Sequence, residues 1–142
     1  MILQTDFRWT MRVYYEDTDS GGVVYYANYL KFFERARTEW LRAAGIGQHA
    51  MVEQEQAMFV VRSTSVEYHK PAKLDDELVI TVRVEKMGRA SMVFVQEAWR
   101  GQHCLSFGRI KVACVHATQF RPCPIPASVM SAIHAHYSLP IN

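Results

Sequence analysis

The chain has no run of apolar residues close to the roughly 20 that a membrane-spanning helix needs. Its first ten residues, MILQTDFRWT, lack the basic stretch and the apolar run of a signal peptide. The net charge is only +2, which is too small to indicate nucleic-acid binding. We therefore expect a cytoplasmic protein that neither binds nucleic acid nor inserts into a membrane.

Cysteines and nucleotide motifs are also scarce. An odd number of cysteines at wide spacing, Cys104, Cys114 and Cys123, fits neither a disulfide framework nor a zinc site. The pair His134 and His136 has no third ligand nearby in the sequence, so we predict no metal. The signatures G-x-x-x-x-G-K and G-x-G-x-x-G are absent, which argues against nucleotide hydrolysis and dinucleotide redox chemistry. We predict no cofactor.

Hydrophobic periodicity outlines the elements of the chain. Apolar residues that recur every second position predict strands over residues 7–15 and 77–85. Richness in Val, Phe, Thr and Tyr predicts a strand over 58–68, and two more strands, 91–99 and 104–115, are expected on either side of a turn at 100–102. Residues 27–44 carry one narrow polar stripe and are apolar over most of the remaining surface, including Leu30, so they predict a buried helix that Gly45 ends. We expect a polar connection around His49–Gln56 and a short terminal helix over Ala127–His136.

These elements favour one architecture. An antiparallel sheet can bury one face, and the long helix needs burial on most of its sides. The economical solution is an α+β hot-dog fold, in which a five-stranded antiparallel sheet wraps around a long central helix as one domain over residues 1–142. Such a sheet has an edge to cover, which favours pairing of subunits.

The most informative segment is Tyr14–Trp40, YYEDTDSGGVVYYANYLKFFERARTEW, in which an acidic turn and two glycines precede the helix. A helix N-terminus offers unpaired N–H groups and about half a positive charge. A carboxylate beside it, Asp19, could attack a bound carbonyl group or activate water against it; the alternative is a residue that stabilises the helix start. Asp17 is expected to brace the turn. Arg37 lies off the polar stripe, which indicates a buried ion pair or an interface contact.

Three blocks carry a resemblance to a known family. They are YYEDTDSGGVVYYANYLKFFERARTEWLR at Tyr14–Arg42, FVVRSTSVEYHKPAKLDDEL at Phe59–Leu78, and FGRIKVACVH followed by RPCPIP. In this order they resemble the hot-dog-fold acyl-CoA thioesterases of the 4-hydroxybenzoyl-CoA thioesterase superfamily, and most of all the tol-pal-associated (YbgC-type) branch.

The resemblance implies a catalytic site. It makes Asp19 the catalytic carboxylate and assigns polarisation of the thioester carbonyl to the backbone N–H groups near Tyr26 and Ala27. It also implies a homodimer or homotetramer whose active sites lie at the dimer interface, lined in part by Phe59–Tyr68 of a neighbouring subunit. Tyr26 stands where the branch commonly has histidine, so an imidazole acid at that position is excluded.

The resulting hypothesis is an acyl-CoA thioesterase that releases a carboxylic acid and coenzyme A, with Asp19 as either nucleophile or general base. Coenzyme A phosphates need cations, for which Arg89 is the first candidate and Lys70 and Lys73 are the others. The alternative is a non-catalytic hot-dog protein that binds acyl-CoA or acyl carrier protein. A hydratase would need a histidine on the helix, which has none. The acyl group of the substrate could be carried by acyl carrier protein instead of coenzyme A. The sequence leaves the preferred acyl group open.

Overall fold

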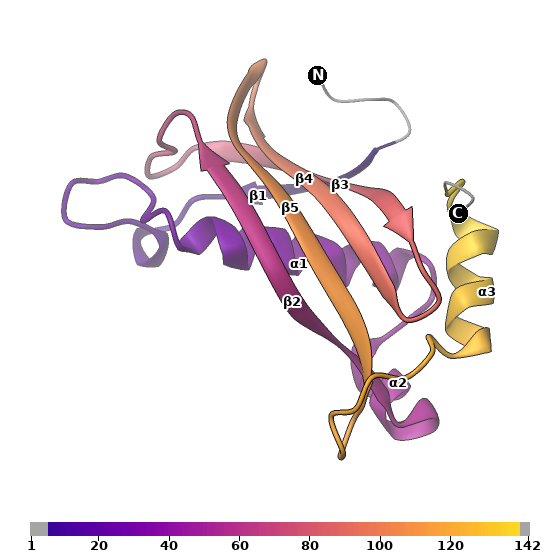
Figure 1. Ribbon diagram of the computed structural model, residues 1–142. Helices are drawn as coiled ribbons and strands as arrows, with labels where there is room; N and C mark the ends of the chain where they lie inside the picture. Colours follow the sequence, from indigo (N-terminus) through magenta and orange to yellow (C-terminus); the bar gives the residue numbers. More distant parts are fainter. Residues whose placement is uncertain (1–5, 140–142) are drawn as a thin grey trace.

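A five-stranded sheet forms the body of the molecule in the computed structural model, which describes residues 6–139 (Figure 1). The strands lie in the order β1-β3-β4-β5-β2, and every neighbouring pair is antiparallel. Their bounds are β1 Phe7–Arg12, β2 Ala57–Tyr68, β3 Glu77–Met87, β4 Ser91–Arg100 and β5 His103–His116. The long helix α1, Asn28–Ala43, crosses one face of this sheet. The predicted hot-dog fold is therefore confirmed.

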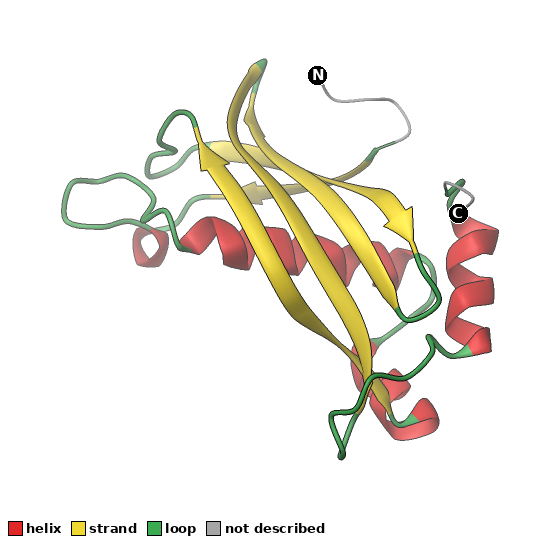
Figure 2. Cartoon of the chain, in the orientation of Figure 1, coloured by secondary structure: helices red, strands yellow, loops and turns green. Residues whose placement is uncertain are grey.

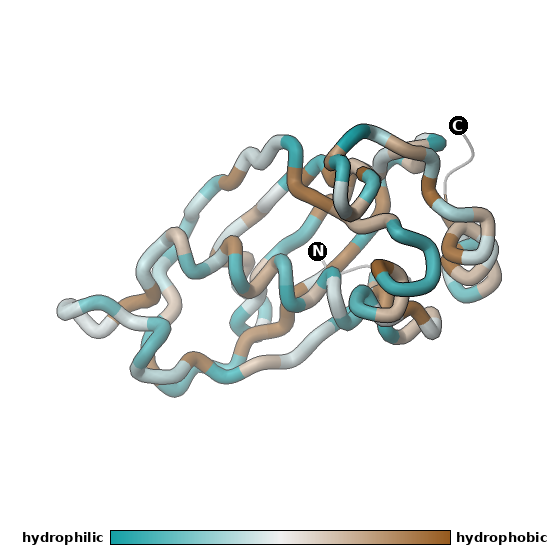
Figure 3. Tube along the Cα trace, turned by 90° about the horizontal axis from the view of Figure 1, so that it is seen from below, coloured by the Kyte–Doolittle hydropathy of each residue, from teal (hydrophilic) through white to brown (hydrophobic). Residues whose placement is uncertain are grey.

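The contact between α1 and the sheet forms the core. The buried residues of α1 are Tyr29, Phe32, Phe33, Ala36, Arg37, Trp40 and Leu41. Gly108 of β5 allows a close approach, because a Cβ atom there would lie 3.0 Å from the Phe33 ring. The helix thus packs directly on the backbone of β5, which fixes where its N-terminus lies. Along much of the Cα trace, hydrophobic residues alternate with hydrophilic ones (Figure 3).

Two further helices lie outside the unit that α1 and the sheet form (Figure 2). The terminal helix α3, Ala127–His136, has the predicted bounds. The prediction of an irregular polar connection at His49–Gln56 was wrong, because Gln48–Glu55 forms the helix α2. Only Met51 of α2 is buried, so this helix lacks the apolar periodicity by which sequence patterns are recognised.

The first strand is shorter than predicted. It ends at Arg12, and Tyr15–Asp17 forms a 3-10 turn. Val13 is buried but Tyr15 is exposed. The alternation of apolar residues therefore continues to residue 15 in the sequence, whereas the strand itself ends at Arg12. The turn brings the acidic segment toward the start of α1. Within residues 6–139, no helix is long and apolar enough to cross a membrane.

The edge strand β2 changes face in its middle. Before the bulge at Arg62, Phe59 and Val61 lie opposite Cys114 and Val112, core residues of β5. After the bulge, the residues on the helix side are Thr64, Val66 and Tyr68, which lie opposite Ile110, Gly108 and Ser106. One edge of β2 pairs with β5 and the other is left open, so this strand presents unpaired backbone groups to a partner.

Candidate active site

The acidic loop folds back on itself and presents Asp19 beside the start of α1. The Asp19 N–H donates to the Val23 carbonyl (2.9 Å), and the Gly22 N–H donates to the Asp19 carbonyl (3.0 Å). Gly22 has a φ of +79°, a left-handed conformation that favours glycine. Thr18 and Val24 form a β-bridge that closes the loop. Asp19 is therefore held next to the segment that leads into the helix.

The side chain of Asp19 is exposed and partly engaged. Its Oδ1 atom accepts a hydrogen bond from the Gly21 N–H (2.8 Å). Its Oδ2 atom has no hydrogen-bond partner among residues 6–139. One carboxylate oxygen is thus oriented by the loop, and the other is free to take a proton or attack an electrophile.

Asp17 has the structural role that the sequence predicted. Its carboxylate accepts a hydrogen bond from the Tyr14 N–H (2.9 Å) and is buried. Its carbonyl oxygen accepts from the Tyr25 N–H (3.2 Å) and from the Asn28 side-chain amide (2.8 Å). Asp17 thereby ties the end of β1 to the start of α1, and it sets the position of the loop that carries Asp19.

The first turn of α1 leaves backbone donors unused. The N–H groups of Asn28, Tyr29 and Leu30 bond to carbonyls three residues earlier. The N–H groups of Tyr26 and Ala27 have no acceptor within the described part of the chain. Unpaired N–H groups at a helix N-terminus carry partial positive charge and stabilise a negative oxygen. These two donors form a ready site for an oxyanion.

Aromatic rings surround those donors. Tyr26 is 59% exposed, and its ring contacts Tyr25 (4.8 Å between centroids) and Tyr68 (5.5 Å). Tyr68 also packs on Tyr29 (5.6 Å). A hollow of about 230 Å³ lies here, lined by Val24, Tyr26, Tyr29, Tyr68, His69, Lys70 and Pro71. Exposed aromatic rings around a hollow mark a binding surface.

The loop that follows β2 is pinned to the same end of α1. The Tyr29 hydroxyl accepts a hydrogen bond from the Ala72 N–H (3.0 Å), and burial raises the pKa of this tyrosine. The Val24 N–H donates to the Ala72 carbonyl (2.8 Å). Farther along the loop, Arg100 donates to Asp76 (2.7 Å). Burial raises the pKa of Asp76, but the bonds from Arg100 and Lys73 outweigh it and leave the pKa below its usual value.

The predicted site residues fall into two groups. Asp19, Tyr26 and Ala27 are gathered by the loop at the helix start, and Lys70 lines the hollow beside Tyr26. Lys73 forms a β-bridge with Val23, which lies four residues after Asp19 in the same loop. Arg89 lies in the turn between β3 and β4, at the opposite end of β3 from this loop. Within one subunit, Tyr26 and Lys70 line the hollow, Asp19 and Lys73 are tied to the loop that precedes α1, and Arg89 lies away from both.

Two side chains, Tyr68 beside the hollow and Arg37 farther along α1, make contacts other than those expected from the sequence. The resemblance placed Tyr68 in the segment Phe59–Tyr68 that a neighbouring subunit contributes to the site, whereas its ring packs on Tyr26 of its own chain. Arg37 is buried as expected, but it donates to the Gln96 side chain (2.8 Å) instead of forming an ion pair. Among residues 6–139, no group of three acidic, histidine or cysteine side chains is placed to hold a metal. The absence of a metal requirement stays a prediction.

Comparison with known proteins gives the same picture. The model of the thioesterase superfamily matches residues 21–106. The acyl-CoA thioesterase YbgC of Haemophilus influenzae is 44% identical over 133 residues, covering 94% of this chain and 98% of that protein.

Solved structures agree with these relatives. A probable thioesterase from Bartonella henselae has a TM-score of 0.81 at 33% identity, covering 85% of this chain and 99% of that one. A Staphylococcus aureus protein in complex with CoA shares the fold, with a TM-score of 0.85 at 14% identity; the match covers 100% of this chain and 90% of that one. The matched segment includes the first turn of α1 with its unpaired N–H groups, and Asp19 lies two residues before it. The chain belongs to the thioesterase superfamily.

Proposed function

We propose that the protein is an acyl-CoA thioesterase in which Asp19 drives hydrolysis at the N-terminus of α1. The observation that carries this proposal is a free Asp19 oxygen on the loop that leads directly into the unpaired N–H groups of Tyr26 and Ala27. The relative from Haemophilus influenzae, an acyl-CoA thioesterase by name, supports the same substrate class. A cytoplasmic location, and an acyl carrier protein as the alternative carrier, stay predictions from the sequence.

The chemistry follows from this arrangement. The thioester carbonyl oxygen accepts from the N–H groups of Tyr26 and Ala27, and it gains negative charge as the carbonyl carbon is attacked. One such donor is worth about 2.7–4 kcal/mol in a transition state. Asp19 either takes a proton from water, whose oxygen attacks the carbon, or attacks directly and forms an anhydride that water then hydrolyses. Both routes give a carboxylic acid and coenzyme A.

The leaving group needs little help. A thiol has a pKa of about 8.5, so a thiolate leaves without a strong acid beside it. Tyr26 can therefore stand at the position where the related branch commonly has histidine. Its ring packs on Tyr25 and Tyr68 and borders the hollow, so in this proposal the side chain holds the substrate while its N–H polarises it.

A second copy of the chain completes the site in this proposal. The open edge of β2 can pair antiparallel with the same edge of another subunit. The side chains of β2 change face at Arg62. If a two-fold axis passes between Arg62 and Ser63, the helix-facing residues of one subunit therefore lie opposite the helix-facing residues of the other along the whole strand. In that register, Phe59 lies opposite Val66 of the partner subunit, and Ala57 lies opposite Tyr68 of the partner subunit.

This pairing also supplies the missing cation. Arg89 lies at the Ala57 end of β2, because Cys114, which is opposite Phe59, bonds through its N–H to the Ala90 carbonyl (2.8 Å). The same end of β2 meets the partner's Tyr68 across the two-fold axis. Arg89 of one subunit would then approach the hollow of the other, where Lys70 also lies. We propose that Arg89 acts across the interface on the coenzyme A phosphates, with Lys70 and Lys73 from the subunit that binds the thioester.

The dimer has a direct test. Val61 is 51% exposed on the helix side of β2, and the proposed pairing buries it. We expect Val61→Glu to weaken dimerisation at least roughly tenfold, because the desolvation cost of burying a carboxylate at the centre of the paired edge exceeds what an attraction to Arg37 would return, and to lower thioesterase activity with it. Light scattering after gel filtration, over a range of protein concentrations, measures the change.

The matched control for this test is Val52→Glu. Val52 is an exposed valine of α2, outside the proposed interface, so its substitution should leave both the mass and the activity unchanged. A Val61→Glu variant that stays dimeric at every concentration would exclude this edge as the interface. A mass of four chains for the wild type would identify the homotetramer.

The function itself is tested by thiol release from a panel of short, long and aromatic acyl-CoA thioesters. We expect turnover of at least one class at a rate well above the spontaneous hydrolysis of the same thioester. A wild-type protein that hydrolyses none of them but binds acyl-CoA would favour the non-catalytic alternative. Hydrolysis of acyl carrier protein thioesters alone would move the proposal to that carrier.

A further inference from the structure

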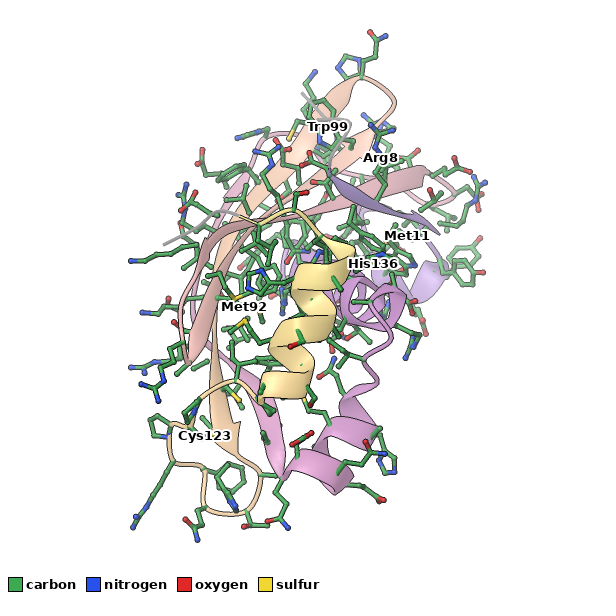
Figure 4. The ribbon with its side chains drawn as sticks, turned by 90° about the vertical axis from the view of Figure 1, so that its right-hand side faces the viewer. Arg8, Met11, Met92, Trp99, Cys123 and His136 are labelled. Atoms are coloured by element: carbon green, nitrogen blue, oxygen red, sulfur yellow. The ribbon has the colours of Figure 1, made fainter. Side chains whose placement is uncertain are left out.

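A small cavity lies between the middle of α1 and the sheet, away from the hollow at the helix start. Its volume is about 90 Å³. Its apolar walls are Leu41, Phe59, Val60, Val61, Met92, Phe94 and Val112, and its polar residues are Glu34, Arg37, Thr38 and Gln48. Met92, labelled in Figure 4, comes from β4 and is buried. A cavity of this size has room for a short group of a few heavy atoms.

The charge in this cavity comes from an unusual arginine. Arg37 is only 9% exposed. Its Nη1 atom donates to the Gln96 Oε1 atom (2.8 Å), and Gln96 is held in that orientation because its Nε2 atom donates to the Phe33 carbonyl (2.9 Å). No other hydrogen bond and no ion pair of Arg37 occurs among residues 6–139. A guanidinium group has five N–H donors, so most of those of Arg37 have no acceptor in the described part of the chain and stay open to water or a ligand.

Burying a cation beside one neutral amide is costly. Burial lowers the pKa of Arg37 to about 10, and the nearby carboxylate of Glu34 acts in the opposite direction. Glu34 lies one turn earlier on α1, where its side chain is exposed to solvent. Solvent screens the charge of Glu34 more strongly than that of Arg37. The side of the cavity formed by Arg37 is therefore positive and short of protein acceptors, which suits an oxygen anion.

The proposed dimer connects this cavity to the catalytic site of the other subunit. Ala57 lies opposite the partner's Tyr68, whose ring borders the hollow next to the helix start. Phe59 and Val61 line the cavity, and they follow Ala57 by two and four residues, or about 7 and 13 Å along the strand. An acyl group held at the partner's helix start can thus run along the helix side of β2 into the cavity.

We infer that this cavity receives the far end of the acyl group, and that the protein favours acyl-CoA substrates whose far end carries a carboxylate. The inference rests on the proposed thioesterase function and on the β2 pairing. The methylene chain would lie against Phe59, Val61 and their apolar neighbours. The terminal carboxylate would accept hydrogen bonds from Arg37, which binds carboxylates with a planar fork of donors.

The test compares matched substrates. For chain lengths of roughly four to eight carbons, which suit the separation along β2, kcat/KM is measured for each acyl-CoA and for its ω-carboxylated counterpart. We expect the wild type to favour the carboxylated member by at least about tenfold at one length, equivalent to about 1.4 kcal/mol. Arg37→Met should abolish this preference while turnover of the plain acyl-CoA is retained. The matched control is Arg35→Met, which removes an exposed arginine of the same helix.

A binding measurement separates failure of this inference from failure of the proposed function. Calorimetry on the Asp19→Asn variant compares the Kd values of the two members of each pair without turnover, and the same tenfold preference is expected. If the wild type hydrolyses plain acyl-CoAs and never prefers the carboxylated member, the inference is overturned and the function stands. If Arg37→Met lowers both substrates alike and the protein becomes monomeric, Arg37 serves the interface and the inference is also overturned.

Discussion

Replacing Asp19 with asparagine is expected to lower kcat for acyl-CoA hydrolysis by about 10²–10⁴-fold, the range that positioned acid–base groups contribute. Asparagine has nearly the same shape, and its side-chain oxygen can still accept the hydrogen bond from the Gly21 N–H. It can neither take a proton from water nor attack the thioester carbonyl. The loss should therefore fall on kcat while KM changes little, as measured by thiol release under steady-state conditions.

The matched control for this prediction is Glu16→Gln. Glu16 is an exposed carboxylate of the same acidic turn, and its removal should leave kcat near the wild-type value. Equal rates for the wild type and Asp19→Asn would remove Asp19 from the mechanism. Because Asp19 lies on the exposed part of the loop, its substitution should not change the free energy of unfolding, and a large change would point to a structural role instead.

The architecture, and the position of Asp19 on the loop that leads into α1, could be predicted from the sequence because their signals are local. Period-two alternation marks Leu78, Ile80, Val82 and Val84 of β3, and all four are buried. The stretch from Asp17 to Asn28 is continuous in the chain, so the closeness of Asp19 to the helix start follows from one turn and two glycines. The structure adds the hydrogen bonds that make Asp17 a brace and leave one Asp19 oxygen free.

Features that depend on pairing between distant segments could not be predicted. Tyr68 meets Tyr26 only because β2 lies beside the N-terminal turn of α1, and the partner of Arg37 is a glutamine on β4. Leu30 was counted with the apolar surface of the helix, yet it is 43% exposed. The hydrophobic pattern of one chain cannot distinguish a residue buried in its own core from a residue buried against a second subunit. Leu30, in the first turn of α1 beside the proposed site, is a residue that this pattern leaves undecided.

Arg89 illustrates the same limit. The sequence favours a cation at a glycine turn as a phosphate contact, but the turn lies at the wrong end of β3 for the site of its own subunit. In the proposed dimer, the register of the β2 edge, set by the face change at Arg62, would bring Arg89 toward the hollow of the other subunit. A contact across such a two-fold axis leaves no periodic signal in the sequence.

Trp40→Ala is expected to lower the free energy of unfolding by about 3–5 kcal/mol, the usual cost of removing a buried large aromatic side chain. Trp40 is buried, meets Phe94 of β4 edge to face at 5.2 Å between centroids, and stacks on Tyr137 at 4.5 Å. The substitution would leave a cavity where α1, the sheet and the residue after α3 meet. Urea unfolding followed by circular dichroism measures the loss.

The matched control, Tyr137→Phe, separates the hydrogen bond of this cluster from its packing. It keeps the ring that stacks on Trp40 and removes only the hydroxyl, which donates to the Trp40 carbonyl. Its expected cost is about 0.5–1.5 kcal/mol, typical of one hydrogen bond. If Trp40→Ala costs no more than Tyr137→Phe, the stacked rings do not hold α3 against α1.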